Sequence, residues 1–193
     1  LLLISDVQYT RIPYETTEKQ DVWLLHRHSV GENIRKIEQT GTPLGKLLSI
    51  KNGFATLKND VYLFSPEAES ATTFTFQKNG IIYEIEREIC RPAIKPNILK
   101  EENDIVKNME QLIFPYIITE NRAEIMAESL IKQEYPLAYA YLSDYKIPLS
   151  ERDKGKRTYG EWFAFGRSQA LDVRVYKLLF PYLSDKPYFV FTN

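Results

Sequence analysis

The sequence predicts an α+β fold of short antiparallel strands and a hairpin with a helical insertion. Three observations favour this class over a doubly wound parallel sheet. Two β-rich runs flank an Asn-Gly pair, two helical patterns follow each other in the second half of the chain, and strands and helices do not alternate regularly. With 193 residues, of which 44% are hydrophobic and 26% charged, the chain can bury a core of its own.

The hairpin is the most strongly predicted element. Residues 73–77 and 81–85 are rich in aromatic and β-branched side chains, and Asn79 and Gly80 between them tolerate the positive φ angles of a tight turn. Apolar runs of similar composition predict further short strands. These lie at residues 46–50, 61–64, 112–118, 162–165 and 188–191.

Two helices are predicted between the later strands. Residues 121–133 place apolar side chains along one stripe and charged side chains opposite. A second helix begins near Pro136, since proline is tolerated in a first turn, and it ends by Pro148 or resumes after a kink. These helices form the insertion.

Composition limits the class of protein. The longest purely aliphatic run has four residues, and no basic leader precedes it, so we expect neither a membrane span nor a secretory signal. A single cysteine, Cys90, cannot form an internal disulfide, which favours a cytoplasmic setting, and we expect it to be a buried, inert thiol.

Residue patterns for catalysis or cofactor binding are missing from the sequence. It contains no glycine-rich phosphate loop of either common type. His26 and His28 would share a face if residues 22–30 formed a strand, but no further ligand has a recognisable spacing. We therefore expect no catalytic residue, no metal site and no cofactor in this chain.

The net charge of −1 hides opposite local charges. Residues 151–177 hold seven basic and four acidic side chains, and residues 87–100 hold four and one. Residues 101–134 are acidic, with eight acidic and three basic side chains. Basic blocks attract polyanions even when the whole molecule is nearly neutral.

The basic stretch 151–177 also carries the most informative residues. Its cations interleave with Gly155 in a polar loop suited to phosphate contacts; they are Arg152, Lys154, Lys156 and Arg157. The run 162–169, Trp-Phe-Ala-Phe-Gly-Arg-Ser-Gln, follows. Arginine and glutamine can make bidentate contacts to guanine and adenine, but a packed strand followed by a turn explains this run equally well.

Five blocks of sequence stand out along residues 42–191. The blocks are Pro43-Leu44-Gly45 leading to Gly53-Phe54-Ala55-Thr56 and Asn59-Asp60-Val61, then residues 89–95, residues 113–116, residues 135–169 and residues 186–189. In this order they resemble the C-terminal target-recognition domain of TaqI-like adenine-specific DNA methyltransferases, a region of type II restriction-modification enzymes. The resemblance implies a fold of the target-recognition-domain type.

The resemblance also implies a function. In that family this domain grips and reads double-stranded DNA, while a separate N-terminal domain binds S-adenosylmethionine and methylates adenine N6 through an Asn-Pro-Pro-Tyr-type motif. No two prolines are adjacent here, so that motif is missing. The chain begins without Met, in an apolar stretch, and we expect residues 1–41 to end the connection from the catalytic domain and residues 42–193 to form the recognition domain.

Roles for single residues follow from the same resemblance. The aromatic side chains of Trp162, Phe163 and Phe165 are expected in the core. Arg167, Ser168 and Gln169 are expected to contact the DNA backbone or to organise local hydrogen bonds.

Two further places are candidate DNA contacts. Thr56, Lys58 and Asn59 form one loop, in which the lysine offers a phosphate donor and the asparagine a base-edge amide. Arg91 and Lys95, in a basic extended segment, could follow the DNA backbone.

Two alternatives remain open. The chain could be the specificity segment of a fused restriction endonuclease and methyltransferase, because a nuclease would lie outside this sequence. It could instead be a protein-interaction module that uses the acidic stretch 101–134 as its working face.

Overall fold

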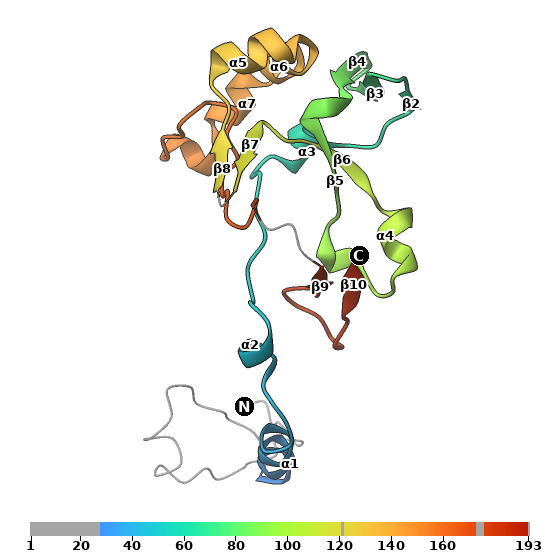
Figure 1. Ribbon diagram of the computed structural model, residues 1–193, viewed down its shortest axis with the longest axis vertical. Coiled ribbons are helices and arrows are strands. Elements are labelled where there is room, and N and C mark those ends of the chain that lie inside the picture. The colour runs from blue at the N-terminus through green and yellow to red at the C-terminus, as the bar shows by residue number, and fades with distance from the viewer. Residues whose placement is uncertain (1–27, 121, 173–175, 193) are drawn as a thin grey trace, which may run out of the picture. The chain divides into compact units, whose positions relative to one another are not determined.

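The computed structural model describes residues 28–120, 122–172 and 176–192 (Figure 1). The chain divides into two compact units, with the boundary between Ile50 and Lys51. The sequence analysis placed a boundary after residue 41.

The first unit contains two helices in its described part, α1 (His28–Glu38) and α2 (Leu44–Leu47). Arg35 and Lys36 lie in the last turn of α1, where positive charge is favourable. The strand predicted over 46–50 is wrong, because Pro43 precedes a short helical turn there. The strand considered over 22–30 falls mostly outside the described residues, and its last three residues begin α1.

The second unit contains a three-stranded antiparallel sheet in the order β1 (Leu63–Phe64), β6 (Glu110–Ile113), β5 (Cys90–Ala93). The strand predicted over 61–64 is half right. Its first two residues belong to the short helix α3 (Asn59–Tyr62), and only the last two pair with β6.

The predicted hairpin is confirmed. Strands β3 (Thr73–Lys78) and β4 (Ile81–Glu86) pair in antiparallel register, and β2 (Ala68–Glu69) adds to the outer edge of β3. Asn79 and Gly80 have φ angles of 52° and 79°, as a tight turn of this twist requires.

Pro115 splits the strand predicted over 112–118, since a proline has no N–H to continue a ladder. The first half is β6, and the second half is β7 (Tyr116–Thr119), which pairs with β8 (Arg122–Ile125). Strand β8 also occupies the start of the helix predicted over 121–133, so that helix, α5, covers only Glu128–Glu134.

The helix predicted from Pro136 is confirmed as α6 (Pro136–Asp144), and α7 (Lys146–Ser150) continues after a break. Helix α6 packs on β4. The carboxylate of Glu86 on β4 accepts the N–H groups of Leu137 and Ala138 at 2.7 and 2.9 Å. These are free donors of the first helical turn, so the contact fixes where α6 begins on the sheet.

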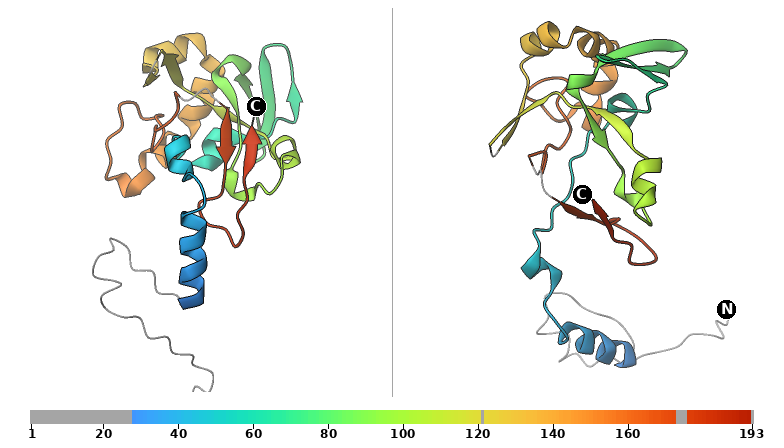
Figure 2. Two further views of the ribbon diagram at one scale, coloured as in Figure 1. Left: turned by 60° about the horizontal axis from the view of Figure 1, so that its bottom comes forward. Right: turned by 45° about the vertical axis from the view of Figure 1, so that its right-hand side comes forward.

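A C-terminal hairpin, β9 (Lys177–Leu179) and β10 (Val190–Thr192), lies beside the segment that holds α4 (Asn103–Lys107) (Figure 2). The strand predicted over 188–191 is therefore shifted by two residues at its start. Three short 3₁₀ turns also belong to the described part of this unit, at Arg87–Ile89, Pro96–Ile98 and Arg152–Gly155.

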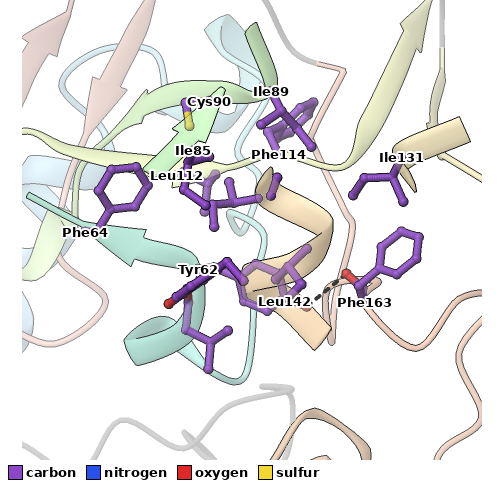
Figure 3. Packing of buried hydrophobic residues seen from close by; sticks show 14 of the residues in the cluster. Tyr62, Phe64, Ile85, Ile89, Cys90, Leu112, Phe114, Ile131, Leu142 and Phe163 are labelled. Carbon is purple, nitrogen blue, oxygen red and sulfur yellow. Dashed lines mark hydrogen bonds between the residues drawn. The ribbon is translucent and has the colours of Figure 1, made fainter. Parts of the chain in front are cut away.

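One hydrophobic core joins α3, β1, the strands β3 to β8 and the helices α5 to α7 (Figure 3). Aromatic side chains form its centre, and Phe64 and Phe76 stack with ring centroids 4.2 Å apart. The Tyr62 hydroxyl donates to the carbonyl of Phe163 at 2.9 Å, which links α3 to the run 162–169. The predicted core positions Phe163 and Phe165 are both buried, and Trp162 packs against their cluster.

Candidate nucleic-acid interface

Two of the predicted DNA-contacting segments lie together in the structure. Ala55 and Arg167 form an antiparallel bridge, in which the N–H of each donates to the carbonyl of the other at 3.0 and 2.8 Å. The Gly166 N–H donates to the Thr56 carbonyl at 3.2 Å, and the Gln169 side-chain amide donates to the Gly53 carbonyl at 3.2 Å. Loop 53–59 and segment 165–170 therefore form one unit.

Gly166 permits this close approach. A Cβ atom at that position would lie 2.3 Å from the Cγ and Cδ1 atoms of Leu57. Leu57 itself has a φ of 59°, a left-handed conformation that leucine seldom adopts. On the other side of the bridge, the Phe54 ring stacks on the buried Phe165 ring at 5.4 Å, so the loop is fixed to the core at both ends.

Arg152 corrects the sequence prediction. It was expected in an exposed basic loop, but it is only 3% exposed. Its guanidinium donates to the carbonyls of Trp162 at 2.8 Å, Ala164 at 2.5 Å and Thr56 at 3.4 Å, and its Nε donates to Leu149 at 2.7 Å. Arg152 therefore holds three segments together from inside. It is no longer a candidate for contact with DNA.

The run 162–165 is not the strand that the sequence predicts. Side chains from elsewhere satisfy its backbone groups in place of a neighbouring strand. Arg152 takes two of its carbonyls, Tyr62 takes a third, and the hydroxyl of Tyr116 accepts the Phe165 N–H at 2.6 Å. Burial raises the pKa of Tyr62 and of Tyr116, so both hydroxyls keep their protons at neutral pH.

Thr56 is the second correction. It was a candidate DNA contact, but it is 1% exposed and its hydroxyl is engaged inside the loop. The hydroxyl accepts the Lys58 backbone N–H at 3.1 Å and donates to Oδ1 of Asn59 at 2.5 Å. Thr56 thus positions the side chain of Asn59, an exposed residue at the start of α3.

Most of the other candidates are accessible on these segments. Lys58 is half-buried, and the exposed ones are Asn59, Lys154, Lys156, Arg157, Arg167, Ser168 and Gln169. Loop 153–158 follows directly on the buried Arg152, whose guanidinium donates to carbonyls of Thr56 and Ala164. Tyr159 supports the turn, since its ring lies 4.4 Å from the Arg152 guanidinium and 5.6 Å from that of Arg157.

Backbone strain is concentrated in loops 53–59 and 153–158 and in segment 165–170. Five non-glycine residues of the described ranges have positive φ angles. One is Asn79 in the hairpin turn, and the other four are Leu57, Asp153, Lys154 and Ala170. Strained conformations of this kind collect at binding and catalytic sites, where the surrounding structure imposes them.

Arg91 and Lys95 belong to a different neighbourhood. The Arg91 guanidinium donates to the carbonyls of Glu88 and Cys90, both at 2.7 Å, and lies 5.8 Å from the Phe114 ring. Lys95 pairs with Glu110 at 2.7 Å. Their bonds tie them to β5 and β6, and the structure does not join them to loop 53–59.

The thiol of Cys90 and the possible metal ligands complete the description of reactive groups in the described ranges. Cys90 is buried and free, as predicted, and burial raises its pKa to about 12. Within the described ranges, no three His, Cys, Asp or Glu side chains are grouped to hold a metal ion. None of the helices described combines the length and apolar character needed to cross a bilayer.

Sequence reasoning missed the residues that hold the interface together. Tyr62, Tyr116 and Leu57 have no local pattern that marks them as partners of the run 162–169. The one available signal was Gly166, directly after the predicted strand 162–165, because a residue without a Cβ allows a close backbone approach.

Comparison with known proteins finds that the chain is similar to a restriction-modification enzyme. No protein-family model matches the sequence. The chain is similar to the "Type II restriction enzyme and methyltransferase RM.Eco57I" of Escherichia coli, with 28% identity over 173 residues. The match covers 82% of this chain and 17% of that enzyme, so the chain spans a small part of its relative. The similarity associates the chain with restriction-modification enzymes.

Proposed function

We propose that this chain is the DNA-binding target-recognition domain of a site-specific adenine-N6 DNA methyltransferase of a restriction-modification system. In this proposal the domain grips and reads duplex DNA, while a domain outside this sequence methylates adenine. The observation that carries the proposal is the pairing of loop 53–59 with segment 165–170, which Arg152 links to the start of the exposed, cationic loop 153–158. Both paired segments contain residues that resemble motifs of the TaqI-like family.

The charges of this surface suit a polyanion. Lys154, Lys156 and Arg157 are exposed on one loop, and Arg167 is exposed on the segment beside it. Lysine and arginine side chains and backbone N–H groups supply most protein contacts to phosphates, whereas amide side chains can reach base edges. Loop 53–59 contributes such an amide in Asn59.

The hollows beside the C-terminal hairpin do not resemble a site for S-adenosylmethionine. Two hollows on the described surface involve the C-terminal hairpin, one formed by residues 180–189 and one between α4 and β10. Neither is lined by a glycine, so neither offers the close backbone cradle of a nucleotide-like cofactor. In the proposal, the cofactor and the methylation chemistry belong to the domain outside this sequence.

The fused arrangement is the second candidate function. The name of the E. coli relative combines a restriction enzyme with a methyltransferase, which favours a parent protein that both cuts and methylates. The purified parent polypeptide decides between the two. A fused enzyme cleaves duplex DNA with Mg²⁺ and also transfers methyl groups from S-adenosylmethionine, whereas a methyltransferase only does the second.

Titration of a labelled duplex at several salt concentrations tests DNA binding directly. We expect weak, mostly non-specific binding at low salt, with an affinity that falls as salt rises by a logarithmic slope of about −0.9 per phosphate contact. Replacing Lys154, Lys156 and Arg157 with alanine should reduce that slope by about 2 to 3.

A matched control removes three cations outside the interface. Lys100, Lys107 and Lys132 are exposed, and their replacement by alanine changes the net charge equally. This control should leave the slope almost unchanged. No binding by the wild type at ~100 μM, beyond the usual non-specific range, would contradict the proposal and favour the protein-interaction alternative.

A further inference from the structure

The Thr56–Asn59 hydrogen bond determines what Asn59 can recognise. Asn59 is exposed at the start of α3, next to the bridge between Ala55 and Arg167. Its Oδ1 lies 2.5 Å from the buried hydroxyl of Thr56. Its side-chain N–H₂ group has no hydrogen-bond partner among the residues that the structure describes.

The orientation of this amide follows from counting donors and acceptors. A threonine hydroxyl has one proton to donate, and a buried hydroxyl needs an acceptor for it. The Thr56 hydroxyl already accepts the N–H of Lys58 at 3.1 Å. If the Asn59 amide were reversed, its N–H₂ would face the hydroxyl, and the hydroxyl proton would lose its acceptor. Thr56 therefore keeps the Asn59 oxygen turned inward.

An asparagine held in this way presents donors only. Asparagine usually recognises adenine by using its oxygen and its N–H₂ together, against N6 and N7. Because the Asn59 oxygen is held against the buried Thr56 hydroxyl, it is directed into the loop and away from a base, so that bidentate contact is lost. In the major groove guanine offers two acceptors, N7 and O6, whereas cytosine offers an amino donor that would face the amide N–H₂.

We propose that Asn59 is a specificity-determining residue that reads a major-groove acceptor, with guanine preferred and cytosine rejected, because Thr56 fixes its amide. This inference rests on the proposed DNA-binding function and adds the class of base that the loop reads. The methylated adenine is a separate base, which the domain outside this sequence would contact.

Selection from a pool of duplexes with a randomised segment, followed by sequencing of the bound fraction, tests the assignment. For the wild type we expect one position enriched in guanine over cytosine by roughly five- to tenfold. Asn59→Asp presents an acceptor in place of a donor, so the same position should change from guanine to cytosine. Asn103→Asp, an equal charge change at an exposed position on α4, should leave the preference unchanged.

Variants of Thr56 test the positioning step separately. Thr56→Val keeps the shape of the side chain and removes the hydroxyl, so the Asn59 amide can rotate and the share of adenine at that position should rise. Thr56→Ser keeps the hydroxyl and should keep the wild-type preference. Thermal unfolding of each variant shows whether it is folded, and if Thr56→Val is not, Asn59→Asp decides the question.

The results separate this inference from the function beneath it. Equal weakening of all sequences by Asn59→Asp would make Asn59 a phosphate contact and overturn the proposal, as would an unchanged preference in a folded Thr56→Val variant. Binding by the wild type without any base preference would overturn the inference and leave the DNA-binding function standing. No binding by the wild type would overturn both.

Discussion

Arg152 and the cations of loop 153–158 are neighbours in the sequence and have opposite roles in the structure. The Arg152 side chain is buried and donates to four backbone carbonyls, whereas Lys154, Lys156 and Arg157 are exposed. The comparison shows that one basic block can supply both the internal support of a surface and the charge on it. A sum of charges along the chain cannot separate these roles.

Removing the buried guanidinium should have the largest effect. Arg152→Ala leaves several buried carbonyls without donors, and we expect the free energy of unfolding to fall by about 3–5 kcal/mol. Arg152→Lys keeps the charge but cannot reach carbonyls on three segments, so it should recover little of this loss. Urea denaturation measures both values.

The alanine variant of the three exposed cations serves as the comparison. Its free energy of unfolding should stay within about 0.5 kcal/mol of the wild type. If Arg152→Ala were as mild as this variant, the distinction between an internal and an external cation would be wrong.

Gly166→Ala should have an intermediate effect on the support of loop 53–59. The added Cβ would overlap the Leu57 side chain, and we expect a loss of about 1–3 kcal/mol in the free energy of unfolding. Leu57→Gly removes the overlapping atoms and relieves the positive φ, so the double variant should be more stable than Gly166→Ala alone. If the losses in unfolding free energy of the two single variants simply add in the double variant, the two residues are not in contact.

Glu128 should have a smaller effect than Gly166→Ala, because it is a partly exposed charge. Its carboxylate accepts the Trp162 indole N–H at 2.8 Å and the Tyr139 hydroxyl at 3.0 Å, and these bonds lower its pKa. The stability that it supplies is therefore present above its unfolded pKa and is lost as the pH falls through the lower folded value. After solvent screening we expect less than about 1 kcal/mol.

Thermal unfolding of the wild type and of Glu128→Gln at several pH values checks this sign. The difference between them should be present at pH 7 and should shrink in acid, below the ordinary glutamate pKa of 4.5. A difference that grew on acidification would contradict the direction assigned to the shift.

Local patterns predicted the parts of the fold that depend on local chemistry. The Asn79-Gly80 turn and the helix start at Pro136 were found because their residues favour those conformations wherever they occur. The strand predicted over 162–165 failed for a long-range reason, since its carbonyls are satisfied by Arg152 and Tyr62 and not by another strand.

The candidate site was predicted in the same partial way. Loop 53–59 and segment 165–170 were both identified, but their pairing through Ala55 and Arg167 has no local signal. The burial of Arg152 and Thr56 could not be predicted, because a polar side chain is buried only where distant backbone groups supply its partners.

In the proposed function, loops 53–59 and 153–158 and segment 165–170 form one DNA-binding surface. Backbone amide NMR spectra recorded while a short duplex is added test this most directly. We expect the largest chemical-shift changes in these three segments, and we expect the changes to fade as salt rises. Shift changes confined to the acidic stretch 101–134, or none at low salt, would contradict it.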